Sequence, residues 1–196
     1  LSYLRGIKVT ATKTVLGNYT RAASHFKSAH EFAIYAGNPY LIFELFAQPR
    51  GVLEIARHYW NRYLTQRSLP YGIVAGPANV LVREWQRAWQ VCKAGDGELI
   101  GRYARAVGGF RAACEFTRAN IPYRPTIACL KAALKELGVI ESDAVAVGTP
   151  ALEATERAEF AGRMRALRAR NAALVEAGWH SEAAQAAAPQ RAHRHG

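Results

Sequence analysis

The sequence predicts an α/β fold in its first half and a helical region in its second half. Three short segments, at residues 4–10, 32–36 and 71–75, are rich in β-branched and small apolar residues, which indicates strands. Helical stretches separate them, and this alternation is typical of βα units that form a parallel sheet. From Glu98 onward the apolar spacing predicts only helices. With 196 residues, 50% of them hydrophobic, the chain can bury a sizeable core.

Glycine and proline mark where the predicted elements end. A break at Gly17 precedes the first helix, the second strand stops at Gly37, and the third strand stops at Gly76. Pro49 and Gly51 interrupt the helical stretch between the second and third strands. The predicted helices cover residues 40–67 with that interruption, 80–93, about 98–119, about 125–137 and about 151–177.

The formal charge of +11 raises the question of a nucleic-acid or membrane partner, because clustered Lys and Arg neutralise phosphates. The basic residues are spread along the chain, and the densest set shares one Ala-rich helix with three glutamates. Since no groove-reading motif accompanies this set, a solvated helix face is favoured and no nucleic-acid partner is expected. The set consists of Arg157, Arg163, Arg165, Arg168 and Arg170, beside Glu153, Glu156 and Glu159.

The cysteines and histidines give no sign of a disulfide framework or a metal site. Cys92, Cys114 and Cys129 are odd in number and lack C-x-x-C spacing, so we expect buried thiols. The histidines lack H-x-x-x-H and H-E-x-x-H spacing, so we expect neither metal nor cofactor. No uncharged apolar run reaches the ~18 residues of a membrane span, and the N-terminus does not resemble a signal peptide. We therefore expect a cytoplasmic protein without a membrane partner.

Lys8 is the most informative residue of the first strand. Because side chains alternate along a strand, Gly6, Lys8 and Thr10 share one face, and Ile7 and Val9 share the other. A buried lysine is costly, yet burial favours the free amine that attacks a ketone. A strand can also carry a lysine that faces solvent, so the strand by itself leaves a structural and a catalytic interpretation open.

The order of several motifs along the chain favours the catalytic interpretation of Lys8. Gly6-Ile7-Lys8 leads into Gly17-Asn18-Tyr19-Thr20-Arg21, and the second strand ends in a glycine at position 37. Next come YGIVAGPAN at 71–79, CKAGD at 92–96 and PTIACLKAALKELG at 125–138. Across about residues 4–165 this order resembles the C-terminal portion of the dihydrodipicolinate synthase/N-acetylneuraminate lyase family. These are class I pyruvate aldolases, which form a Schiff base on a lysine.

The resemblance implies the C-terminal part of a (β/α)8 TIM barrel, namely its last three strands, followed by an α-helical C-terminal extension. Residues 1–95 would form the partial barrel, with an inserted helix near 51–68 that serves packing, the barrel mouth or an oligomer contact. Residues 96–178 would form a C-terminal helical region, and 179–196 a disordered tail. The chain begins without Met, a few residues before the lysine strand, which suggests an incomplete sequence.

The resemblance also implies roles for individual residues. Lys8 would form an imine with pyruvate or another 2-oxo acid, and an aldehyde would be the second substrate of an aldol condensation or cleavage. Gly37 would border the pocket through its backbone, and Val74 would stand where the family has an apolar residue whose backbone faces the substrate. Thr10 would also bind substrate. A homo-oligomer is implied as well.

Part of the catalytic apparatus is not assigned by the resemblance. The carboxylate-binding loop and the shuttle tyrosine of the family lie on earlier strands, so Tyr3, Tyr35 and Tyr71 cannot take that role, and we expect the chain alone to be inactive. Two alternatives remain. One is a non-catalytic barrel paralogue that acts as a binding or oligomerisation module, and the other is a basic nucleic-acid-binding helical protein.

Overall fold

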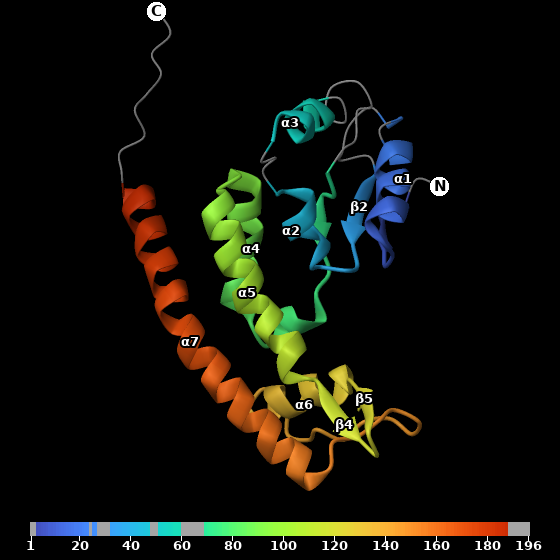
Figure 1. The fold of residues 1–196 in the computed structure, drawn as a ribbon, viewed down its shortest axis with the longest axis vertical. Coiled ribbons are helices and arrows are strands. Elements are labelled where there is room, and N and C mark those ends of the chain that lie inside the picture. Colours follow the sequence, from blue (N-terminus) through green and yellow to red (C-terminus); the bar gives the residue numbers. More distant parts are fainter. Residues whose placement is uncertain (1–2, 24, 27–31, 48–50, 60–68, 188–196) are drawn as a thin grey trace, which may run out of the picture. The chain divides into compact units, whose positions relative to one another are not determined.

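The structure is a computed structural model in which the chain divides into two compact units, Leu1–Gly108 (unit 1) and Gly109–Gly196 (unit 2) (Figure 1). Unit 1 carries the strands that were predicted to bear the site, whereas unit 2 is mostly helical. The residues that the structure describes are 3–23, 25–26, 32–47, 51–59 and 69–187.

Unit 1 contains a parallel sheet of three strands in the order β1-β2-β3. The strands are β1 (Gly6–Val9), β2 (Ala33–Ala36) and β3 (Gly72–Ile73). They fall within the three segments that the sequence predicted, and their parallel pairing confirms the α/β class. The paired residues are Gly6↔Ala33, Ile7↔Ile34, Lys8↔Tyr35 and Val9↔Ala36 between β1 and β2, and Tyr35↔Gly72 and Ala36↔Ile73 between β2 and β3.

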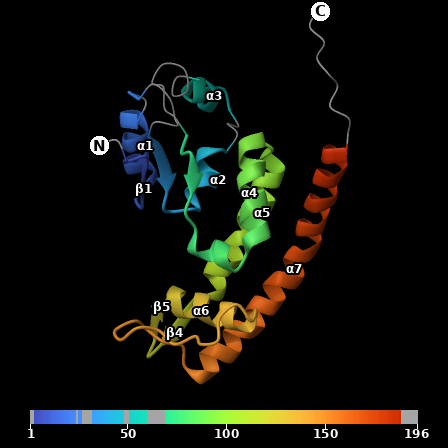
Figure 2. The ribbon, with the colours of Figure 1, turned by 180° about the vertical axis from the view of Figure 1, so that it is seen from behind.

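One face of this sheet is covered by the helices α1 (Lys13–Ala23) and α2 (Leu41–Leu45). Every second strand residue contributes to this face, as the alternation of side chains requires. Both views show α1 alongside the strands (Figures 1 and 2). The core between sheet and helices consists of Val9, Leu16, Ile34, Ala36 and Leu41, with Ile73 and Leu45 packed against it.

An aromatic cluster joins α2 to α4 (Val82–Ala94), which follows the short 3-10 helix η2 (Gly76–Asn79). The Trp85 side chain is 2% exposed, and its ring centroid lies 5.3 Å from that of Tyr40. The helix ends at Gly95, whose φ of 77° provides the left-handed cap that glycine adopts most easily. The prediction of two helices in place of one is confirmed, because α2 ends at Leu45 and α3 (Val52–Tyr59) is a separate helix. Residues 48–50 of the predicted interruption and 60–68 of the predicted insertion lie outside the described residues.

Unit 2 is built around the last turns of α5 (Gly97–Ala113) and the long helix α7 (Ala154–Ala187), with α6 (Thr126–Glu136) packed against α7. The rings of Phe110 and Phe160 meet edge to face, with centroids 6.3 Å apart. The helix α7 continues to Ala187, past the end predicted near 177, because its Ala-rich sequence has a high helix propensity. Residues 188–196 of the predicted tail lie outside the described residues.

The prediction that the region from Glu98 onward contains only helices is wrong. An antiparallel hairpin of β4 (Phe116–Arg118) and β5 (Ile121–Tyr123) follows α5. Its two turn residues, Ala119 and Asn120, have φ angles of 50° and 63°. Positive φ at both central residues is the geometry of a type I′ turn, which usually contains a glycine that makes it recognisable in the sequence. The turn was missed because alanine rarely adopts this conformation.

Within the part of the chain that the structure describes, no helix has the length and apolar character needed to cross a membrane.

Candidate functional site

The residues predicted to form the site lie towards the carboxyl ends of three neighbouring parallel strands. Lys8 lies within β1, and Thr10 directly follows this strand. Gly37 follows β2, and its N–H donates to the last carbonyl of β1 (2.8 Å). Val74 follows β3, and its N–H donates to the last carbonyl of β2 (2.9 Å). The sheet therefore gathers the four residues at the end where parallel α/β folds place their ligand sites.

Thr10 and Gly37 pack directly against each other. A Cβ atom on Gly37 would overlap the Thr10 Oγ1 and would lie 3.1 Å from the Thr10 Cα. Position 37 therefore requires a glycine because the two strand ends approach closely.

Lys8 points to the face of the sheet opposite the α1–α2 core, because it alternates with the buried Val9. Lys8 and Thr10 are both exposed, so Lys8 is not the buried lysine that the catalytic interpretation of the strand invoked. On the same side, Val74 is 45% exposed. We call this side of the sheet, where Lys8, Thr10 and Val74 are exposed, the open face.

Tyr35 is the neighbour of Lys8 that sequence reasoning left unassigned. The two residues are paired in register between β1 and β2, so both side chains leave the same face of adjacent strands about 4.8 Å apart. The ring of Tyr35 lies over Gly72 and meets Tyr71 edge-on, with ring centroids 5.8 Å apart. Strand register is the missing signal, since the sequence shows which residues are in each strand but not which residues are side by side.

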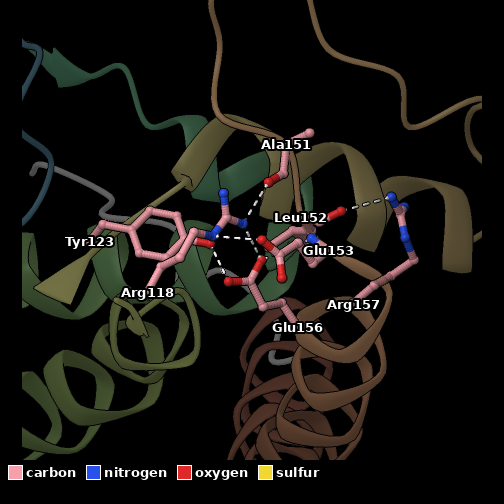
Figure 3. A network of polar contacts seen from close by, with 7 residues as sticks. All are labelled: Arg118, Tyr123, Ala151, Leu152, Glu153, Glu156 and Arg157. Carbon is pink, nitrogen blue, oxygen red and sulfur yellow. Dashed lines mark hydrogen bonds and ion pairs between the residues drawn. The ribbon is translucent and has the colours of Figure 1, made fainter. Parts of the chain in front are cut away.

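A second polar cluster lies in unit 2, where the hairpin meets the start of α7 (Figure 3). The carboxylate of Glu156 accepts hydrogen bonds from the Tyr123 hydroxyl, from Arg118 Nη2 (2.7 Å) and from the Glu153 N–H (2.8 Å). Arg118 Nε also contacts Glu153 Oε1 (2.9 Å), and the guanidinium lies 4.8 Å from the centroid of the Tyr123 ring. The cluster therefore fastens the hairpin to the helix.

The titration of this cluster reflects its burial and its hydrogen bonds. Burial, together with the neighbouring Glu156, raises the pKa of Tyr123 to about 12. Burial acts to raise the pKa of Glu156, but the hydrogen bonds from Tyr123, Glu153 and Arg118 outweigh it, and the net pKa is lowered. Glu156 thus remains ionised while Tyr123 keeps its proton, which is the arrangement that preserves their hydrogen bond.

An open pocket of about 520 Å³ lies between the hairpin and α7. Its charged lining residues are already engaged in ion pairs, including Glu115 with Arg124 and Glu159 with Arg163. The same holds for Arg118 with Glu153 and Glu156. The pocket is consequently a structural junction, and sequence reasoning missed it because the segment that forms β4 was predicted to be the end of a helix.

Two further arginines of α7, Arg157 and Arg165, also have partners. Arg157 pairs with Asp143 and donates to the Leu152 carbonyl (3.5 Å), and Arg165 pairs with Glu136 (3.3 Å). Ion pairs of this kind are typical of a solvated helix face. The three cysteines are buried and none forms a disulfide, as predicted; burial raises the pKa of the Cys92 thiol to about 12.

Comparisons with known proteins show a likeness to solved structures. No protein-family model matches the chain, and the curated proteins yield no match. Among solved structures, the chain is similar to dihydrodipicolinate synthase from the commensal bacterium Bacteroides thetaiotaomicron, with a TM-score of 0.59 and 21% sequence identity. The likeness covers 82% of this chain but 45% of that chain. It shows a shared fold over less than half of the other protein, in agreement with the resemblance that the motifs indicated.

Proposed function

We propose that this chain is part of a Schiff-base lyase or aldolase of the dihydrodipicolinate synthase type, in which Lys8 forms an imine with pyruvate or another 2-oxo acid. The observation that carries the proposal is the position of Lys8 on the open face, close to the contact between Thr10 and Gly37 at the strand ends. The fold shared with a dihydrodipicolinate synthase supports it.

The exposure of the open face is the physical reason for placing this sheet in a barrel. Parallel sheets normally have both faces covered, yet Lys8, Thr10 and Val74 are exposed. In a closed (β/α)8 barrel the helix-covered face points outward and the other face lines the lumen. Further strands would therefore enclose Lys8 without changing its position in β1. Cytoplasmic location, a homo-oligomer and the absence of a nucleic-acid partner belong to the same proposal.

The reaction follows from the chemistry of the amine. The Lys8 nitrogen attacks the keto carbon, a C=N bond forms and water leaves. The protonated imine draws electrons from the neighbouring carbon, so loss of a proton there gives an enamine that attacks an aldehyde, and cleavage runs the same steps in reverse. Hydrolysis of the imine then restores the amine. In this scheme the Thr10 hydroxyl donates a hydrogen bond to the bound acid, and Gly37 and Val74 border it.

The imine is tested by trapping it on the chain. Incubation with pyruvate and borohydride should add one reduced pyruvate to the peptide that contains Lys8, as measured by mass spectrometry. Lys8→Arg should abolish the adduct, because arginine keeps the charge but does not form an imine. Lys13→Arg is the matched control, since Lys13 is 53% exposed in its side chain and pairs with Glu44. An unlabelled Lys8, or equal labelling of Lys13, would refute the proposal.

A non-catalytic module is the second candidate function, and the exposure of Lys8 is the observation that favours it. Such a module would use the open face to bind a 2-oxo acid or to assemble, without a covalent step. Binding of pyruvate in the absence of any borohydride-trapped adduct would select this candidate over the aldolase.

A further inference from the structure

Tyr35 is the large neighbour of Lys8 on the open face. The register places these two side chains on adjacent strands at the same level, and the other residues of β1–β3 on this face are small. A ligand bonded to the Lys8 nitrogen therefore meets the Tyr35 ring as the principal side-chain surface that these strands provide. The residues of the three strands that share this face are Gly6, Lys8, Ala33, Tyr35 and Gly72.

The orientation of the Tyr35 ring is fixed from the side of β3. A Cβ atom on Gly72 would lie 3.1 Å from both Cδ1 and Cε1 of Tyr35, so the ring rests directly on the glycine backbone. Tyr71 meets the same ring edge-on, with an interplanar angle of 77°. Tyr35 is half-buried, and it stays beside Lys8 as a positioned aromatic surface rather than as a freely rotating side chain.

We propose that Tyr35 is a specificity-determining residue that favours 2-oxo acids with an aromatic ring next to the reacting ketone. The inference rests on the proposed function, because the imine on Lys8 is what holds the ligand beside the ring. Contact between two aromatic rings stabilises a complex beyond the effect of the surface area that it buries, and this extra stabilisation corresponds to roughly 2- to 12-fold in affinity. Pyruvate presents only a methyl group to Tyr35 and gains less.

Competitive trapping measures this preference. The protein is incubated with pyruvate and phenylpyruvate together; each ketone condenses with the Lys8 amine, water leaves, and borohydride delivers hydride to the imine carbon. We expect Tyr35→Leu to lower the ratio of phenylpyruvate to pyruvate adducts by roughly 2- to 12-fold. Tyr35→Phe should retain the ratio because the ring remains. Tyr19→Leu, which removes a 45% exposed tyrosine on α1, is the matched control.

Binding without the covalent bond separates this inference from the aldolase proposal. In a Lys8→Ala protein, saturation-transfer NMR should detect the phenylpyruvate ring, and a further Tyr35→Leu change should remove the signal. If Lys8 is never labelled, the aldolase proposal fails. If Lys8 is labelled with the same adduct ratio in wild type and Tyr35→Leu, or if the NMR signal does not depend on Tyr35, the specificity inference is overturned while the aldolase proposal stands.

A second variant covers the case in which Tyr35→Leu does not fold. Gly72→Ala places a methyl group against Cδ1 and Cε1 of Tyr35 and displaces the ring without removing it. We expect the adduct ratio to change, because the surface beside Lys8 moves. An unchanged ratio in a folded Gly72→Ala protein, as judged by circular dichroism, would also overturn the inference.

Discussion

Replacing Glu156 by alanine should destabilise unit 2 far more than replacing a nearby exposed glutamate. The Glu156 side chain is 11% exposed and accepts hydrogen bonds from Tyr123, Arg118 and the Glu153 N–H. Glu153 immediately precedes α7 and so occupies its N-cap position, and the hydrogen bond from its N–H to the Glu156 carboxylate is one of the two hydrogen bonds of a capping box. The substitution therefore removes a helix cap and the anchor of the hairpin at the same time.

The size of the effect follows from these contacts. Losing a helix cap costs about 1 kcal/mol of the free energy of unfolding, and losing charge-assisted hydrogen bonds costs about 1.5 to 3 kcal/mol. The second cost falls towards its lower end because Arg118 is 42% exposed and regains water. We expect a total of about 2 to 3 kcal/mol for Glu156→Ala. Glu159→Ala, on the same helix, removes an exposed pair with Arg163 and should cost about 0.3 to 0.5 kcal/mol.

Urea unfolding followed by far-UV circular dichroism measures both losses, and hydrogen exchange of the β4–β5 amides shows whether the hairpin is released. Equal losses for Glu156→Ala and Glu159→Ala would refute the assignment of Glu156 as the anchor.

The pH dependence of stability gives a second check on the role of Glu156. Because hydrogen bonds lower the pKa of folded Glu156 below its unfolded value, its contribution is present above about pH 4.3 and is lost as the pH falls through the folded pKa. The difference between wild type and Glu156→Gln should therefore shrink in acid.

Three further outcomes are expected. Gly37→Ala should destabilise unit 1 by about 1 to 3 kcal/mol, because its methyl group overlaps the hydroxyl of Thr10. Gly17→Ala in α1 has open space around it and should stabilise unit 1 by up to about 1 kcal/mol, and thermal unfolding of the two variants measures both changes. Tyr123 should keep its proton to about pH 12, so its hydrogen bond to Glu156 stabilises the fold below about pH 10 and is lost as the pH rises through 12. An ultraviolet titration of wild type against Tyr123→Phe tests this, and coinciding curves would contradict the expected pKa of Tyr123. Cys92 should resist alkylation in the folded protein and react only on unfolding, and rapid labelling under native conditions would disprove its burial.

The elements of unit 1 could be predicted from the sequence because their signals are local. The three strands are short apolar runs, and the structure places β1, β2 and β3 inside the predicted segments. The predicted break at Gly17 is wrong, because α1 begins at Lys13 and Gly17 lies within it. The hairpin of unit 2 could not be predicted, because its turn uses Ala119 and Asn120 in left-handed conformations that fixed side-chain contacts must enforce. Those contacts come from α7, far along the sequence, through Glu156.

The candidate site was predictable in its residue types but not in its environment. Alternation within β1 places Lys8 opposite Val9, and the structure bears out that Val9 faces the core. Whether Lys8 is buried depends on what packs on the open face, so the alternation of side chains along β1 cannot predict it. The pairing of Lys8 with Tyr35 likewise depends on strand register, which a parallel sheet fixes through its packing and not through a turn.

The exposure of Lys8 separates two requirements of the proposed reaction. Imine formation needs an accessible amine, which the open face provides, whereas turnover also needs the enamine to be shielded from water, because closed sites protect reactive intermediates from hydrolysis and stray protonation. Borohydride trapping depends on the first requirement alone. A chain that is labelled at Lys8 by pyruvate but does not consume an aldehyde would therefore support the imine step of the proposed function and not its aldol step.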